Sequence, residues 1–296
     1  MTVELVVLGG GRMGEAIACG LLAAGRSGTG GAAGGTGAAD PGAGAADRAG
    51  AADPGTAAAG LVVVERSAER RVELAARRPD LRVEAALPAA AGVVLAVKPP
   101  DVPAACEEIA ALAAPPRRVL SIAAGVTTAA LRTWLGLDGP AVLRAMPNTP
   151  ALVGAGASAV AAGAGADRDD LAWAESILRA VGTVVTVDER LLDAVTGLSG
   201  SGPAYVFLVA EALIDAGVLV GLPRPVARDL TVQTLLGAAR LLAETGEAPE
   251  ALRAGVTSPG GTTAAGLRAL EVGGVRAAMI DAVVAATARA AELGVA

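Results

Sequence analysis

Short runs of Val and Leu alternate with longer amphipathic segments over the first two thirds of the chain. The apolar runs lack polar alternation, as expected of strands that are covered on both faces. The segments between them repeat apolar residues with the period of a helix. This order predicts an α/β fold with a doubly wound, mostly parallel sheet. Strands are expected at Glu4–Leu8, Leu61–Val64, Leu81–Glu84, Val93–Val97, Arg118–Ser121, Ala141–Ala145, Ala157–Ala162 and Thr183–Val187.

The last third of the chain predicts helices only. Beyond about Asp188 the strand-like runs stop, and several segments have more apolar surface than one small bundle can bury. We therefore expect an all-α domain over residues 188–296 that forms a homodimer. Helices are expected at Met13–Ala24, Ala68–Arg77, Thr127–Leu135, Asp169–Arg179, Pro203–Val220 and Pro225–Thr245, between Pro100 and about Ala114, and from Pro249, Thr263 and Gly274 onward.

One segment interrupts the alternation of strands and helices. Residues 26–60 consist almost entirely of Gly, Ala, Asp, Pro and Thr, and they contain the sequence Ala-Ala-Asp-Pro-Gly twice. Such a segment has little bulky apolar surface to offset the entropy lost on ordering. We expect a mobile, low-complexity surface insertion.

The net charge, the apolar windows and the cysteine content limit the possible binding partners and the expected location of the protein. A net charge of −6 gives no reason to expect nucleic acid. The apolar window Tyr205–Val220 contains Glu211 and Asp215, so no membrane span is expected. Cys19 and Cys106 lie far apart in sequence and are expected to be packing residues. Because the N-terminal residues include no basic segment typical of a signal peptide, a cytoplasmic location is expected.

Two shortages limit the chemistry. The chain has no histidine, which excludes a Ser-His-Asp triad, a histidine general base and a His-ligated metal, and no metal site is expected. Lys98 is the only lysine, whereas arginine is abundant. Lys98 is either a remnant of a composition that favours arginine or a position that needs a compact ammonium group.

A glycine-rich turn lies between the first expected strand and the first expected helix. Gly9, Gly11 and Gly14 have the spacing G-x-G-x-x-G, which allows a tight turn, close approach of a pyrophosphate and close packing of helix on strand. This context predicts a dinucleotide-binding domain over residues 1–187. Its turn is formed by Leu8, Gly9, Gly10, Gly11, Arg12, Met13 and Gly14.

The end of the second strand carries two conflicting signals about the cofactor. An acid is expected there to bind the adenosine ribose, and removal of the insertion brings Glu65 to the usual spacing. A carboxylate that accepts hydrogen bonds from a ribose diol favours NADH. Arg66 and Ser67 could instead hold a 2′-phosphate, which favours NADPH. An exposed Glu-Arg pair without a cofactor role is the alternative.

Small residues follow two further strands of the predicted sheet. Ligands bind outside the carboxyl ends of the strands in such sheets. A nicotinamide ring and its ribose are expected to lie against the backbone at Ala96, Val97, Lys98 and Pro99, and at Ala124 and Gly125. The segment Met146–Pro150 follows the next strand, and its prolines are expected to shape the cleft.

A second glycine-rich turn precedes a helix near the end of the chain. Val256–Thr263 contains two glycines and several hydroxyl side chains directly before an apolar, helix-like run. Such a turn can aim several N–H groups at one point, and the helix behind it adds a partial positive charge. The turn predicts a site for a small anion, most simply a carboxylate. Together with the dinucleotide turn, it indicates an oxidoreductase that acts on a small acid.

The chain resembles the pyrroline-5-carboxylate reductase family over nearly its whole length apart from the insertion. The resemblance rests on Gly9–Gly14, Val97–Pro99, Met146–Pro150, Val195–Tyr205 and Pro249–Glu271, of which the last two segments are the most specific. It implies a Rossmann-like domain joined to a helical dimerisation domain, with dimers assembled into larger rings. The implied reaction is hydride transfer from NADPH or NADH to the C=N carbon of 1-pyrroline-5-carboxylate, giving L-proline.

The resemblance also implies roles for individual residues. Ser258 and the backbone N–H groups of Gly261, Thr262 and Thr263 would bind the substrate carboxylate. Thr196 would hydrogen-bond the ring nitrogen, and Glu189 would be a further contact to it. A protonated cyclic imine is already electrophilic, so the lack of histidine is compatible with this reaction. Thr196, Ser258 and Thr263 are therefore the expected catalytic residues. Alternatively, Thr196 is a capping or core hydroxyl, and Ser258 and Thr263 cap the next helix.

Some features depart from the family, and two rival functions remain. The insertion is foreign to the family, and Glu65 stands where a neutral residue is common, so an NADPH preference is in doubt. A β-hydroxyacid dehydrogenase or ketopantoate-type reductase shares the domain plan but needs a lysine in the helical domain, and no lysine follows Lys98. A catalytically silent relative that binds dinucleotide and acts by assembly is the second rival.

Overall fold

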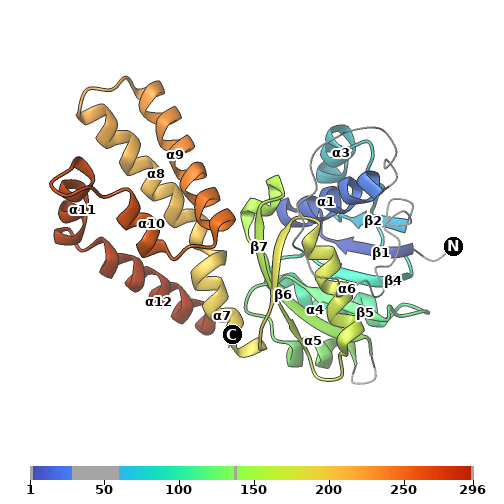
Figure 1. The fold of residues 1–296 in the computed structure, drawn as a ribbon. Helices are drawn as coiled ribbons and strands as arrows, with labels where there is room; N and C mark the ends of the chain where they lie inside the picture. Colours follow the sequence, from blue (N-terminus) through green and yellow to red (C-terminus); the bar gives the residue numbers. More distant parts are fainter. Residues whose placement is uncertain (1–2, 29–59, 137–138, 295–296) are drawn as a thin grey trace, which may run out of the picture. The chain divides into compact units, whose positions relative to one another are not determined.

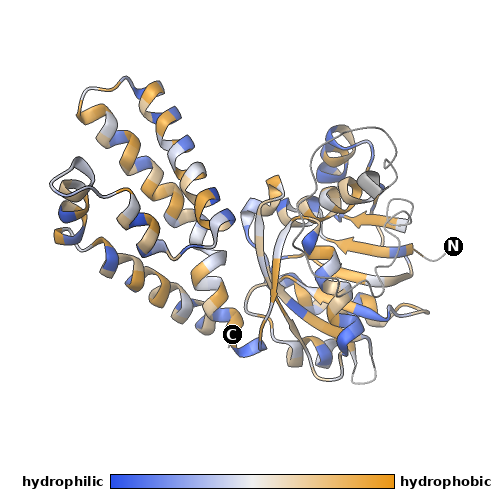
Figure 2. Ribbon diagram, viewed as in Figure 1, coloured by the Kyte–Doolittle hydropathy of each residue, from blue (hydrophilic) through white to orange (hydrophobic). Residues whose placement is uncertain are grey.

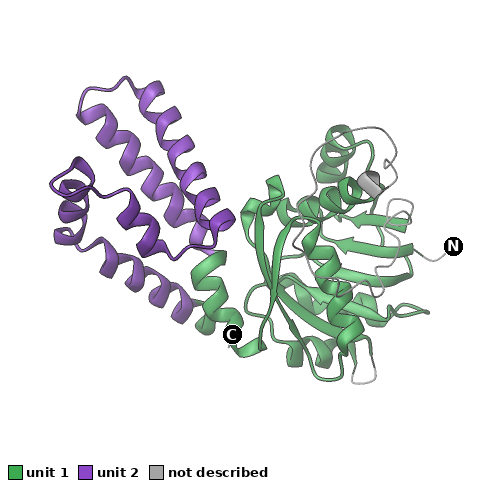
Figure 3. Cartoon of the chain, viewed as in Figure 1, with its two compact units in different colours: residues 1–200, 290–296 green, residues 201–289 purple. Residues whose placement is uncertain are grey.

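The computed structural model describes residues 3–28, 60–136 and 139–294, so most of the expected insertion lies outside the described residues. The described chain forms two compact units (Figure 3). The first comprises residues 1–200 together with 290–296, and the second comprises residues 201–289. The first unit continues to residue 200, whereas the sequence predicts a domain boundary between residues 187 and 188. That domain boundary stays a prediction.

An eight-stranded sheet forms the centre of the first unit (Figure 1). Its strand order is β3-β2-β1-β4-β5-β6-β7-β8, and all neighbours are parallel except β6 and β7. The chain leaves β1 toward β2 on one side and returns to β4 on the other. The carboxyl ends of β1 and β4 therefore form a topological switch point. The strands are β1 (Val3–Leu8), β2 (Leu61–Val64), β3 (Val83–Glu84), β4 (Ala90–Leu95), β5 (Arg118–Ser121), β6 (Ala141–Met146), β7 (Gly156–Ala162) and β8 (Gly182–Thr186).

Helices cover both faces of this sheet, as the unbroken apolar strands predict. Successive residues of a strand point to opposite faces, so Val93 and Leu95 join one apolar core while Val94 joins the other. One core includes buried side chains of α4 and α5, and the other includes those of α1 and α6. The helices are α1 (Arg12–Gly28), α3 (Ala68–Arg77), α4 (Val102–Ala110), α5 (Thr128–Leu135) and α6 (Arg168–Arg179). The Rossmann-like, mostly parallel fold is thus confirmed.

Several sequence expectations need correction in this unit, among them the end of α1 and the bounds of β4. Helix α1 continues to Gly28, so the first residues assigned to the insertion are helical. Strand β4 begins at Ala90 and ends at Leu95, three residues earlier at its start and two at its end than expected. Pairing of Ala90 with Val3 explains the early start, since a neighbouring strand holds residues of low strand propensity in place.

Helices alone form the second unit and the segment that leads into it. A 3-10 turn at Glu189–Leu191, the short helix α7 (Leu192–Val195) and a π-helical segment at Thr196–Gly200 complete the first unit. The second unit has only two buried residues, Ala227 and Thr231, and its helices carry much exposed apolar surface (Figure 2). Its helices are α8 (Gly202–Leu219), α9 (Arg224–Thr245), α10 (Pro249–Gly255), α11 (Thr262–Val272) and α12 (Val275–Gly294), of which α12 ends in the first unit.

A largely buried ion pair joins the sheet to α6. Arg118 Nε donates to Asp170 Oδ1 at 2.6 Å, and the Asp170 side chain is 6% exposed. Asp170 also forms a reciprocal capping box with Asp167 at the start of α6. Burial by itself raises the pKa of Asp170. The hydrogen bonds from Asp167 and Arg118 outweigh burial and hold the pKa below its ordinary value.

We expect Asp170→Asn to lower the free energy of unfolding at neutral pH by about 2 kcal/mol or more, because it breaks a largely buried pair. A depressed pKa stabilises the fold above the ordinary aspartate pKa of 3.8 and loses that effect as the pH falls through the folded-state value. The difference between wild type and variant should therefore shrink in acid. Urea denaturation at several pH values measures it. The exposed pair Asp188–Arg190 supplies the control, and Asp188→Asn should change stability by less than about 1 kcal/mol.

Candidate functional site

The glycine-rich turn connects β1 to α1 at the switch point of the sheet. Gly9 has a φ of +115°, and a Cβ there would lie 2.6 Å from the carbonyl oxygen of Ala96. A Cβ on Gly14 would lie 2.0 Å from the carbonyl oxygen of Gly9, so α1 can approach β1 only without a side chain. A Cβ on Gly11 would meet nothing within 4 Å. The turn is therefore closed toward the sheet and open at Gly11.

The start of α1 supplies hydrogen-bond donors beside this opening. The N–H of Glu15 donates to Gly11 O at 2.9 Å, so the helical ladder begins only there. The N–H groups of Arg12, Met13 and Gly14 precede that bond and belong to the first turn, where an α-helix offers them no acceptor of its own. Open space at Gly11 and these donors fit a pyrophosphate.

The end of β2 lies against the same turn. Glu65 Oε2 accepts a hydrogen bond from the N–H of Gly10 at 3.0 Å, and Oε1 accepts one from the N–H of Ser67 at 2.8 Å. Ser67 caps α3, and its hydroxyl accepts from the N–H of Arg70. Arg66 forms an ion pair with Glu108. The structure thus brings Glu65 to the glycine turn, pairs Arg66 with Glu108 and uses the Ser67 hydroxyl oxygen as an acceptor at the start of α3.

The other predicted cofactor residues follow the strands next to β1. Ala96 N donates to Leu8 O at 2.8 Å, which places Ala96 and Val97 beside Gly9. Lys98 and Pro99 are exposed and begin a 3-10 turn at Pro99–Asp101. Ala124 and Gly125 follow β5, and Gly125 has a φ of +78°. The backbone of Gly294, at the end of α12, lies against Gly125, and a Cβ on Gly125 would be 3.3 Å from it.

Thr196 begins the π-helical segment between α7 and α8. Its Oγ1 donates to the carbonyl oxygen of Leu192 at 2.8 Å, and Ser199 Oγ donates to that of Val195 at 3.1 Å. These hydroxyls satisfy backbone acceptors around the widened turn. Because the Thr196 proton is engaged, the lone pairs of its oxygen are left as acceptors. Single π turns within helices are frequent at functional sites.

Two polar side chains that the sequence did not single out for this role anchor the Thr196 segment and the 3-10 turn before α7. Asn148 is 8% exposed; its Nδ2 donates to Ser199 O at 3.0 Å, and its Oδ1 accepts from the N–H of Ala157. Arg144, on β6, donates to Glu189 Oε1 at 3.2 Å. From the sequence, the prolines around Asn148 are expected only to shape the cleft. The contacts of Asn148 itself could not be predicted, because an amide in a loop has many possible partners.

Glu189 is already bound within the first unit. Its carboxylate accepts from the N–H of Thr128 at 2.7 Å and from the Thr128 hydroxyl at 2.6 Å, in addition to Arg144. Burial alone raises the pKa of Glu189, but the Thr128 hydrogen bonds and Arg144 outweigh it and hold the pKa below its ordinary value. These partners favour an anchoring role. Its predicted contact with a substrate nitrogen stays a prediction.

The second glycine-rich turn lies at the start of α11 in the second unit. Gly261 is the N-cap residue, and no side chain caps the helix, so the alternative that Ser258 or Thr263 caps it is wrong. The N–H of Gly261 donates to Ser258 O at 3.0 Å, and that of Ala265 donates to Gly261 O. The N–H groups of Thr262 and Thr263 are therefore the first-turn donors available to an anion. Gly261 contributes the turn itself.

Neither the cysteines nor the acidic residues indicate further chemistry. Cys106 is fully buried in the core, and burial raises the pKa of its thiol to about 12; burial also raises the pKa of Cys19. Thiols that stay protonated are poor nucleophiles and metal ligands. Among the residues that the structure describes, no three His, Cys, Asp or Glu side chains are grouped to hold a metal ion.

Comparison with known proteins gives a consistent result. A model of the pyrroline-5-carboxylate reductase dimerisation domain matches residues 189–293. The pyrroline-5-carboxylate reductase of Mycobacterium tuberculosis is 40% identical over 98% of this chain and 96% of its own. That of Synechocystis is 52% identical over 68% of this chain and 74% of its own. The solved Coxiella burnetii pyrroline-5-carboxylate reductase has a TM-score of 0.80 and 37% identity, covering 99% of both chains. The Plasmodium falciparum pyrroline carboxylate reductase, solved with NADP bound, has a TM-score of 0.77 and 26% identity, covering 99% of this chain and 98% of its own.

Proposed function

The chain belongs to the pyrroline-5-carboxylate reductase family, and from this membership we propose how its residues serve the reaction. It is an oxidoreductase that reduces 1-pyrroline-5-carboxylate to L-proline with NADH or NADPH. The observation that carries this function is the similarity over nearly the whole chain, which includes both halves of the fold. The same similarity argues against the rival function of a β-hydroxyacid dehydrogenase.

The glycine-rich turn after β1 would hold the pyrophosphate of the cofactor. Its fit rests on the open space at Gly11 and on the first-turn N–H groups of α1. Ala96–Pro99, Ala124 and Gly125 would lie toward the nicotinamide half, at the ends of β4 and β5. When bound, the cofactor supplies the hydride for the C=N carbon.

Thr196 would bind the ring nitrogen of the substrate. Its hydroxyl proton is engaged by Leu192 O, so its oxygen can accept a hydrogen bond from the N–H of a protonated imine. Such a contact orients the C=N bond and stabilises its charge without a histidine. Asn148 and Glu189 act as positioning residues, because Asn148 ties the Thr196 segment to the loop after β6 and Glu189 ties the turn before α7 to the first residue of α5.

The turn before α11 would bind the substrate carboxylate. Thr262 and Thr263 supply backbone N–H donors, and the exposed Ser258 hydroxyl lies beside the turn. The positive end of the 11-residue helix α11 favours a negative charge at this place. The substrate, a small carboxylic acid with a neighbouring imine, thus needs one anion site and one acceptor.

Self-association explains the apolar surface of the second unit. A bundle with only two buried residues cannot offset its own ordering entropy, and the family match assigns this region to dimerisation. Among the described residues, Glu189–Leu219 is also long and apolar enough to cross a membrane by length and composition, and none of its most apolar window is buried. We assign that surface to a second copy of the chain. Larger rings, a cytoplasmic location and the lack of nucleic-acid and membrane partners belong to the same proposal.

The experiment that tests this function follows the absorbance of the reduced cofactor with purified protein. Oxidation should require 1-pyrroline-5-carboxylate, and Thr196→Ala should lower kcat by about 10²-fold while the cofactor Kd stays the same. Thr196→Ser keeps the hydroxyl and is the matched control. Full activity of Thr196→Ala would remove Thr196 from the mechanism. No imine-dependent oxidation with either cofactor would instead support a silent, assembly-only role.

A further inference from the structure

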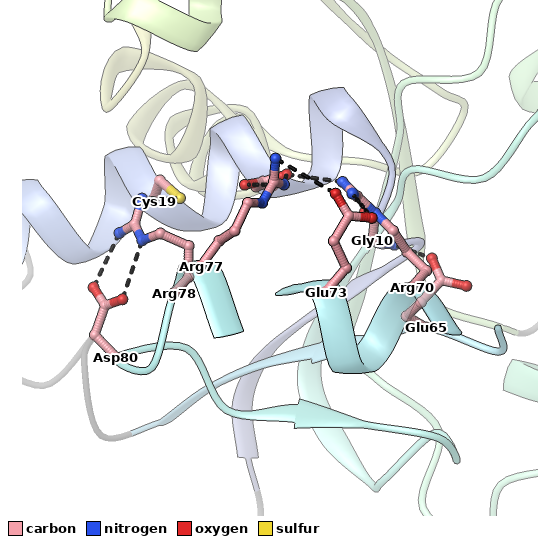
Figure 4. Close-up of polar contacts among 9 residues, drawn as sticks. Gly10, Cys19, Glu65, Arg70, Glu73, Arg77, Arg78 and Asp80 are labelled. Atoms are coloured by element: carbon pink, nitrogen blue, oxygen red, sulfur yellow. Dashed lines mark hydrogen bonds and ion pairs between the residues drawn. The ribbon is translucent and has the colours of Figure 1, made fainter. Parts of the chain in front are cut away.

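The carboxylate of Glu65 is fixed at the place where the adenosine ribose of a dinucleotide is expected. It follows β2, next to the switch point, and accepts a hydrogen bond from the N–H of Gly10 in the glycine turn (Figure 4). It accepts a second one from the N–H of Ser67 at the start of α3. A Cβ on Gly10 would lie 3.0 Å from Glu65 Oε2, so the fit is close. Each carboxylate oxygen uses one acceptor position in these bonds and keeps another for a ribose hydroxyl.

The arginines around Glu65 are engaged by other partners. Arg70 forms ion pairs with Glu15 and Glu73, and its Nε donates to Gly10 O at 3.1 Å. Arg71 donates to the backbone carbonyl oxygens of Glu65 and Arg66. Figure 4 shows the chain of acids and arginines that runs along α3 from Glu65. A phosphate at this place would therefore compete with two carboxylates for Arg70 and with two backbone carbonyl oxygens for Arg71.

Arg66 is the arginine most easily released from its partner, yet it does not make this place favourable for a phosphate. Its ion pair with Glu108 is exposed, with 58% of the Arg66 side chain open to solvent, and such pairs are weak. If Arg66 turned toward a 2′-phosphate, it would leave Glu108 without its partner. The fixed Glu65 carboxylate would still lie beside the phosphate, and like charges at close range repel.

We propose that Glu65 makes this enzyme prefer NADH, because its carboxylate accepts hydrogen bonds from the adenosine ribose diol and repels a 2′-phosphate. The proposal rests on the reductase function above and decides between the two cofactors that the sequence leaves open. Glu65 acts here as a specificity residue, at a distance from the reacting atoms. Removal of its charge should reduce the difference in affinity between NADH and NADPH.

Isothermal titration calorimetry of the full-length protein with NADH and with NADPH tests the proposal directly. For wild type we expect a Kd for NADH at least about tenfold lower than that for NADPH. Glu65→Gln should weaken NADH binding and bring the two Kd values within about threefold. Glu65→Asp keeps the charge, and its Kd for NADH should stay lower than its Kd for NADPH. Asp80→Asn removes a charge at the far end of α3 and is the matched control, with the wild-type ratio expected.

The outcomes separate this inference from the reductase function. Equal or tighter binding of NADPH by wild type overturns the proposal, and so does an unchanged preference in Glu65→Gln. If either result occurs while the protein still reduces 1-pyrroline-5-carboxylate, only the cofactor inference fails. A clear NADH preference without imine-dependent oxidation supports Glu65 and rejects the reaction. Lack of binding by both dinucleotides at millimolar concentration rejects both.

Discussion

Gly14→Ala should abolish dinucleotide binding and strongly destabilise the protein. The added Cβ would lie 2.0 Å from the carbonyl oxygen of Gly9 and 3.2 Å from Val7 Cγ1, so α1 must move away from β1. Overpacking against backbone cannot be relieved by a rotamer change, and we expect a loss of about 3 kcal/mol or more. In a chain of this size the Tm should fall by at least about 6 °C. Differential scanning calorimetry and calorimetric titration with NADH measure the two effects.

Gly11→Ala is the matched control for this prediction. A Cβ at Gly11 meets nothing within 4 Å, so the fold should tolerate it with little change in Tm. The same Cβ would enter the space assigned to the pyrophosphate, so NADH affinity should still fall. A Gly14→Ala protein with the wild-type Tm and NADH affinity would show that close packing of α1 on β1 is not required.

Phe207→Asp, on α8, should convert the dimer to monomers and abolish activity. Phe207 is 63% exposed in the isolated chain and lies in the region that matches the dimerisation domain. A carboxylate placed in a desolvated apolar interface lacks a partner there, and this costs several kcal/mol. Light scattering coupled to size-exclusion chromatography should show the mass of a single chain, and Tm should then depend little on protein concentration.

Val72→Asp supplies the control for this substitution. Val72 lies on α3 and is 71% exposed, so it matches Phe207 in exposure but belongs to the first unit. Its mass in solution should equal that of the wild type. Ile280→Asp, on α12, extends the test to a second helix of the same bundle. An intact, active dimer in both Phe207→Asp and Ile280→Asp would place the association surface elsewhere.

Much of the fold could be predicted because local signals agree with the tertiary structure. The bounds of β2, α3 and β5 were predicted to the residue, since each is a buried apolar run or a helix with a clear capping residue such as Ser67. The reversed direction of β7 was missed. Only a 3-10 turn at Thr149–Val153 separates β6 from β7, which is too short for the crossover that a parallel pair needs. The direction of β7 could therefore be predicted from the length of the connection but not from the composition of the strand.

The candidate sites were predictable where backbone geometry demands one residue type. Glycine at Gly9 and Gly14 follows from close approach of the chain to itself, so the dinucleotide turn is visible in the sequence. The partners of Glu189 were not visible, because Thr128 and Arg144 lie 61 and 45 residues away in the chain. The π-helical segment was missed as well. Its hydrogen bonds depend on tertiary contacts such as Asn148 with Ser199 rather than on helix propensity.

The π-helical segment between α7 and α8 has a geometric consequence for the evolution of this enzyme. Each residue of a regular helix turns the chain by about 100°, so a rigid, continuous helix would fix the angular phase of Thr196 against that of Phe207. The widened turn changes that phase by a fixed amount, because a π turn holds more residues than an α turn. Thr196 donates to Leu192 O, and Asn148 holds the neighbouring Ser199. A mutation that restored a regular helix would therefore rotate every side chain of α8 about the helix axis relative to Thr196.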